Sequence, residues 1–111
     1  MGLDNLWKKN DNEDARVEGD FQICGGMFSD NGNSSFRGKV YWRLIEDITM
    51  VNLYDDMITN EQIKQMADDL EKTEFIPEYI SHYDVEEEEF NDLKKMFRLH
   101  ADAGHYLISF Y

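Results

Sequence analysis

The spacing of the apolar residues changes at Gly104, from the period of a helix to the composition of a strand. Before this glycine, an apolar stripe that includes Phe90 and Phe97 predicts an amphipathic helix over 84–104. After it, residues 105–111 are mostly aromatic and aliphatic, which predicts a strand packed into the fold. The fold therefore has to pack helix against strand.

Two further helices follow from local signals. Thr59 and Gln62 have the spacing of a capping box, so a helix should begin there. Pro77 suits the first turn of a short helix, because the N–H group that proline lacks is not needed at that position. Asp84 with Glu87 predicts the cap of the long C-terminal helix.

The first half of the chain is less regular. Residues 20–24 alternate polar and apolar side chains, which predicts a strand, and we expect it beside 105–111. Residues 36–48 fit both a strand and a helix. We favour the helix, because adjacent apolar pairs break the alternation and Ser34 or Ser35 offers an N-cap. If this segment were a strand, the Asn-Gly pair before it would form a hairpin turn.

These elements predict an α+β fold, with three to four helices packed on a small, mostly antiparallel sheet. Residues 1–111 should form a single domain, since a chain of this length buries roughly two-thirds of its unfolded surface. Residues 8–19 alternate in charge, so we expect 1–19 to be a mobile N-terminal arm, anchored at Leu3, Leu6 and Trp7.

The chain is strongly acidic, with 24 Asp and Glu against 11 Lys and Arg and a net charge of -13. Binding to a phosphate backbone depends on clustered cations, so direct binding to nucleic acid or to an anionic membrane is not expected. No apolar run approaches the length of about 20 residues that spans a bilayer. Cys24 cannot form an internal disulfide, and we expect a soluble, cytoplasmic protein.

Residues 24–38 are rich in Gly, Ser and Asn, a composition typical of a loop that approaches a ligand closely. Arg37 would bind a carboxylate or phosphate group of such a ligand. The glycine spacing matches no phosphate-binding motif, and no catalytic, metal or cofactor pattern is complete, so we lean towards a protein that is not an enzyme. The candidate ligand-binding residues are Gly25, Gly26, Asn33, Ser34, Ser35 and Arg37.

Adjacent acid pairs suggest a different role. Asp55, Asp56, Asp68 and Asp69 are candidate residues for binding a basic protein partner, provided that they form one continuous patch. A non-enzymatic interaction module is our first functional hypothesis, and a ligand-binding or enzymatic domain that uses loop 24–38 is the alternative. The high aromatic content, 14%, would also tolerate a homodimer interface.

The opening residues 1–5 with Trp7, the segment 24–29 and the segment 35–41 resemble small uncharacterised proteins of bacteriophages and marine bacteria. The resemblance implies a phage or marine source. It implies no activity and transfers no catalytic residue. Such a source would suit a small acidic protein that acts on host machinery, or an acidic surface adapted to salt.

Overall fold

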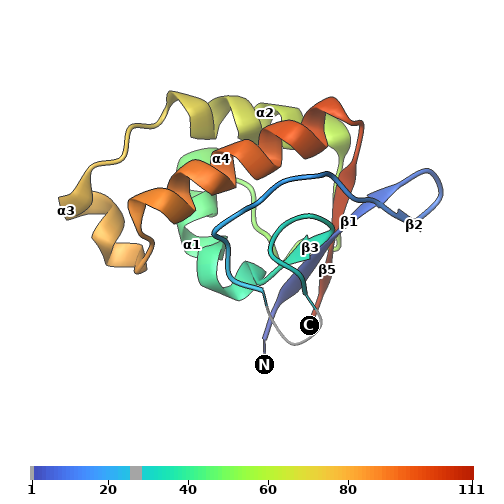
Figure 1. Cartoon of the computed structure of the whole chain (residues 1–111), viewed down its shortest axis with the longest axis horizontal. Helices are drawn as coiled ribbons and strands as arrows, with labels where there is room; N and C mark the ends of the chain where they lie inside the picture. The colour runs from blue at the N-terminus through green and yellow to red at the C-terminus, as the bar shows by residue number, and fades with distance from the viewer. Residues whose placement is uncertain (1, 26–28) are drawn as a thin grey trace.

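The computed structural model describes residues 2–25 and 29–111. Over these residues the chain forms four α-helices, a short 3-10 helix and five strands (Figure 1). In chain order the elements are β1 (Asp4–Lys9), β2 (Glu13–Asp14), β3 (Ser35–Phe36), α1 (Gly38–Thr49), β4 (Met57–Ile58), α2 (Asn60–Lys72), α3 (Pro77–Ile80), η1 (Ser81–Tyr83), α4 (Glu87–Asp102) and β5 (Tyr106–Phe110).

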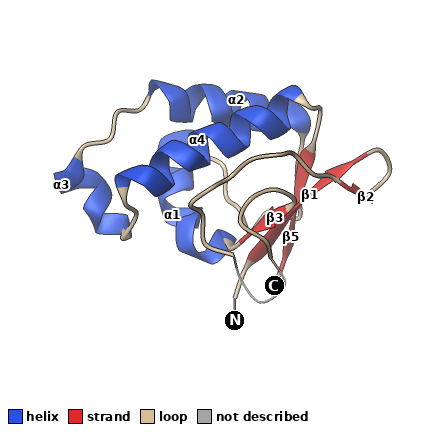
Figure 2. Ribbon diagram, viewed as in Figure 1, coloured by secondary structure: helices blue, strands red, loops and turns tan. Residues whose placement is uncertain are grey.

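The strands form an antiparallel sheet in the order β2-β1-β5-β4, and β3 pairs with β1 on the same edge as β2. Figure 2 shows the helices gathered on one side of this sheet. The buried apolar side chains form the core between the two layers. The predicted α+β class is confirmed.

The central strand is β1, which the sequence analysis assigned to a mobile arm. Leu3, Asn5 and Trp7 are buried beneath the helices, and β1 pairs along five residues with β5. The arm is therefore wrong for residues 4–9, which lie inside the sheet, and Ala15 just beyond them is also fully buried. The strand was not predicted because Asp4, Asn5 and Lys8 are polar but buried. A half-buried strand is normally recognised by the alternation of exposed polar and buried apolar residues.

Residues 20–24 form no strand and pair with no strand among the described residues, so the predicted strand is wrong. Phe21 and Ile23 are buried as the alternation predicted. The amides that follow each of them donate to side chains instead of a neighbouring strand: Gln22 N donates to Asp92 and Cys24 N donates to the Tyr41 hydroxyl, at 2.7 and 2.8 Å. The tail does form a strand, β5, and its neighbours are β1 and β4.

The helix predictions are largely confirmed. The predicted helix over 36–48 is α1, which begins two residues later, at Gly38, and ends at Thr49. Arg37 occupies its N-cap position in place of Ser34 or Ser35, because β3 takes up residues 35–36. The capping box at Thr59 is present in α2, and Pro77 begins α3. The long helix α4 starts later than Asp84 predicts.

The reason for the later start of α4 lies in the backbone at Asp84, which is left-handed, with φ of 55°. The N-cap is Glu86, and its backbone N–H donates to Glu89 at 3.4 Å. The capping residues are therefore Glu86 and Glu89, two positions beyond the predicted pair.

Helices α2 and α4 pack side by side over the sheet (Figure 1). Arg98 of α4 bridges Asp68 and Glu71 of α2, and Lys94 donates to the Thr73 carbonyl that follows α2. Within residues 2–25 and 29–111, no helix combines the length and the apolar character needed to cross a membrane.

A close contact between Asn5 and Gly38 fastens β1 to the start of α1. A Cβ atom on Gly38 would lie 1.7 Å from Asn5 Oδ1 and 3.1 Å from Leu3 Cδ2. Asn5 cannot easily move, because its Nδ2 donates to the Leu53 carbonyl at 2.9 Å. This position therefore requires glycine.

We expect Gly38→Ala to lower the free energy of unfolding by about 1–3 kcal/mol, the usual cost of overpacking. In an ordinary helix interior the same change stabilises by up to about 1 kcal/mol. Chemical denaturation measures the difference. In an Asn5→Ala background the added methyl group should cost much less. An equal cost in both backgrounds would contradict this account of the contact.

Candidate functional site

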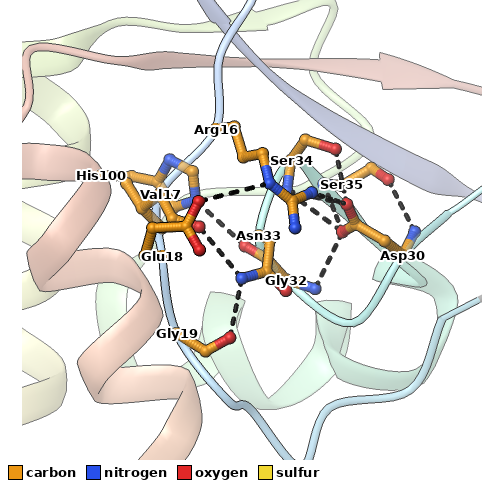
Figure 3. A network of polar contacts seen from close by, with 10 residues as sticks. All are labelled: Arg16, Val17, Glu18, Gly19, Asp30, Gly32, Asn33, Ser34, Ser35 and His100. Atoms are coloured by element: carbon orange, nitrogen blue, oxygen red, sulfur yellow. Dashed lines mark hydrogen bonds and ion pairs between the residues drawn. The ribbon is translucent and has the colours of Figure 1, made fainter.

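The carboxylate of Asp30 organises the predicted ligand loop from within. It accepts hydrogen bonds from Ser34 Oγ at 2.6 Å and from the backbone amides of Gly32, Ser34 and Ser35 (Figure 3). Burial favours a higher pKa for Asp30, but these hydrogen bonds together hold the pKa below its ordinary value. The loop thus forms a turn around its own carboxylate.

The candidate ligand-binding residues of this loop contact the protein itself. Asn33 Nδ2 donates to the carbonyls of Val17 and Gly19, at 3.0 and 2.7 Å. The hydroxyl of Ser35 accepts from Asp30 N, while that of Ser34 donates to the Asp30 carboxylate. Gly25 is exposed, and Gly26 lies outside the described residues. These polar side chains therefore already have partners: Asn33 holds segment 17–19 against the loop, and the two serine hydroxyls bond to Asp30 within the loop.

Arg37, the predicted anion contact, pairs with Asp4. Its Nη1 lies 3.2 Å from Asp4 Oδ1, and the Asp4 side chain is 6% exposed. The guanidinium therefore neutralises a buried carboxylate at the start of β1, which favours a structural role for Arg37.

A hollow of about 430 Å³ lies beside Cys24 and Gly25, against the start of α4. Its lining includes Glu86, Glu88 and Glu89. Arg37 and the Ser34-Ser35 pair are not part of the lining, so the hollow does not bring the predicted anion contacts together. Three carboxylates at its wall oppose the binding of an anion.

A buried histidine pair fixes the other side of the loop. His100, at the end of α4, is fully buried, and its ring stacks on Trp7 with centroids 3.9 Å apart. His100 Nε2 lies 3.0 Å from the Gly32 carbonyl, and its Nδ1 lies 2.8 Å from His105 Nδ1. Because a carbonyl only accepts, Nε2 of His100 carries the proton, so His105 donates to Nδ1 of His100.

The four acids proposed for a partner occupy two different elements. Asp55 and Asp56 are exposed in the turn before β4. Asp68 and Asp69 lie eight and nine residues after Asn60, the first residue of α2, which is roughly 12 Å along its axis. Asp68 binds Arg98, and Asp69 accepts from Gln65. Asp55 and Asp56 are therefore the better placed pair for an external partner.

The sheet has a second apolar face, which the sequence analysis did not identify. Paired residues of antiparallel strands share a face, as do residues two apart along a strand. Leu6 pairs with Ile108, and Ile108 also pairs with Met57. The members of this face are Leu6, Met57, Tyr106, Ile108 and Phe110, and we call them the outer sheet face.

The outer sheet face points away from the helices, since its neighbours in sequence, Trp7, Ile58 and Leu107, are the residues buried in the core. Met57 and Phe110 are 55% and 63% exposed. Ion pairs flank the face, with Asp4–Arg37 beside Phe110 and Lys8–Asp14 beside Tyr106. Asp55 and Asp56 immediately precede Met57, so acidic groups lie at its edge.

Comparisons with known proteins identify no relative of this chain. No family model matches it, and no match was found among the curated proteins or the solved structures. Within the described part of the chain, no group of three or more His, Cys, Asp or Glu side chains is arranged to hold a metal ion.

The histidine pair makes stability depend on pH. Burial lowers the pKa of His100 from 6.5 to about 4, and burial also lowers the pKa of His105. The unfolded chain therefore binds more protons than the folded protein between about pH 4 and 6.5. The stability contributed by the neutral pair is complete above pH 6.5 and is lost as the pH falls through this window.

We expect the free energy of unfolding to fall by about 1–2 kcal/mol between pH 7 and pH 5, a range that lies above the ordinary pKa values of Asp and Glu. Urea denaturation at a series of pH values measures this slope. His82 is exposed, so His82→Gln should leave the slope unchanged. A stability that is flat from pH 7 to pH 5 would contradict the buried, neutral state of His100.

Proposed function

We propose that this protein is a non-enzymatic interaction module that binds a basic protein partner on the outer sheet face. The observation that carries this proposal is the apolar face of strands β1, β5 and β4 opposite the helical layer, on which Met57 and Phe110 are exposed and Leu6, Tyr106 and Ile108 are partly exposed. Contiguous apolar surface of this kind commonly marks a protein–protein interface. An apolar centre with a charged rim is the usual anatomy of such an interface.

Charge supports a basic partner. The chain carries 24 acidic residues against 11 basic ones, so its field attracts a cationic surface and speeds encounter. Asp55 and Asp56 at the edge of the face would contact basic residues at the rim of the partner, whereas Asp68 is already bound to Arg98.

The alternative function, a ligand-binding or enzymatic domain that uses loop 24–38, stays a prediction. The internal hydrogen bonds of Asn33, Ser34 and Ser35 and the pairing of Arg37 with Asp4 favour the interaction module. The predicted likeness to phage and marine bacterial proteins and the cytoplasmic location also stay predictions.

The proposal is tested with Phe110→Glu, which places a charge in the apolar face without touching the core. A partner captured from a lysate by the unaltered protein should be lost by this variant. Ile76→Glu is the matched control, because Ile76 is 50% exposed but lies before α3, away from the sheet. Asp55→Asn with Asp56→Asn should weaken binding at low salt and flatten its salt dependence.

Both glutamate variants should keep the free energy of unfolding within about 0.5 kcal/mol of the original, as is usual for exposed positions. If Phe110→Glu retains the partner, or if Ile76→Glu loses it equally, the outer sheet face is not the binding surface. Analytical ultracentrifugation of the same proteins identifies the homodimer alternative. Self-association that Phe110→Glu abolishes would place a second copy of the chain on this face instead of a basic partner.

A further inference from the structure

A second hollow lies between α1 and η1 and differs from the rest of the surface in its charge. It has a volume of about 270 Å³. Its lining consists of Lys39, Val40, Trp42, Arg43, His82, Tyr83 and Asp84, and we call it the α1–η1 pocket. Basic side chains thus line a hollow in a chain with a net charge of -13.

The two fixed cations of the pocket, Lys39 and Arg43, are four residues apart on α1 and so lie on the same helical face. A like-charged pair at this spacing opposes helix formation. Among the described residues, neither cation lies within ion-pair distance of a carboxylate, although acidic residues outnumber basic ones more than twofold. A bound anion would relieve this repulsion.

The neighbours of Arg43 keep it available to such an anion. Asp47, one turn further along α1, accepts a hydrogen bond from the Tyr83 hydroxyl. This bond also ties η1 to α1 and raises the pKa of Tyr83, so the phenol stays protonated. The Arg43 guanidinium lies over the ring of Trp42, 5.3 Å from its centroid, which orients it without neutralising it.

The rest of the lining supplies apolar surface and further polar groups. Val40, Trp42 and Tyr83 provide apolar surface, and exposed His82 adds a third group that carries positive charge when protonated. Asp84 is the carboxylate of the lining and leaves the fixed charge of the pocket positive. The volume limits the ligand to a small molecule, since typical ligand pockets begin at about 300 Å³.

We infer that the α1–η1 pocket binds a small phosphomonoester that carries a flat ring, with the phosphate between Lys39 and Arg43 and the ring against the apolar wall. A phosphate dianion suits two fixed cations and a titratable histidine better than a carboxylate monoanion does. The site is separate from the outer sheet face, so its test does not depend on the proposed partner.

The test uses phenyl phosphate as the probe and the indole N–H signals of the two tryptophans as the NMR readout. Trp42 lines the pocket, whereas Trp7 is 1% exposed in the core, and Trp42→Phe assigns the two signals. We expect phenyl phosphate to shift the Trp42 signal saturably and to leave Trp7 unmoved. Arg43→Ala should weaken the affinity at least tenfold, and Lys39→Ala should also weaken it.

Lys64→Ala is the matched control, because Lys64 is an exposed cation on α2 outside the pocket, and it should leave the affinity unchanged. The melting temperatures of Lys39→Ala and Arg43→Ala should stay at or slightly above that of the original protein, since each substitution removes the repulsion between these two cations. Inorganic phosphate and benzoate should both bind more weakly than phenyl phosphate. Equal affinity for inorganic phosphate, tighter binding of benzoate, or no saturable shift of Trp42 would overturn the inference.

Discussion

The stack of Trp7 on His100 is the contact on which the rest of the structure depends. It joins the central strand β1 to the end of α4, and through His100 Nε2 it also holds the Gly32 carbonyl of the loop. Phe36 and Phe97 pack around the same tryptophan. A charged imidazole would be costly in this setting, so the fold holds together through a neutral histidine whose two nitrogens both have partners.

The helices were predictable because their signals are local. The capping box at Thr59 and the period of the apolar stripes need no knowledge of the tertiary fold. Strand β1 was not predictable in the same way. Asn5 is fully buried and its Nδ2 donates to the Leu53 carbonyl, while Asp4 pairs with Arg37, and both partners come from distant parts of the chain. Burial of a polar residue depends on such long-range partners, which sequence patterns do not show.

The candidate sites show the same limit. Small polar residues are typical of ligand-binding loops, but they are equally typical of turns held by internal hydrogen bonds, such as those that Ser34 and Ser35 donate to Asp30. The sequence alone does not distinguish the two, because both require the same hydrogen-bonding groups. The outer sheet face left one signal in the sequence: the tail is apolar at Tyr106, Ile108 and Phe110 as well as at Leu107. Which of these residues face solvent depends on the side of the sheet that the helices cover (Figure 2).

The most direct test of this account is the protonation of His100 in the folded protein, measured from the nitrogen chemical shifts of its imidazole ring by NMR. The structure predicts that Nε2 carries the proton, that Nδ1 accepts, and that the ring stays neutral down to about pH 4. A proton on Nδ1 at neutral pH, or a titration of the folded protein near the ordinary pKa of 6.5, would contradict the account.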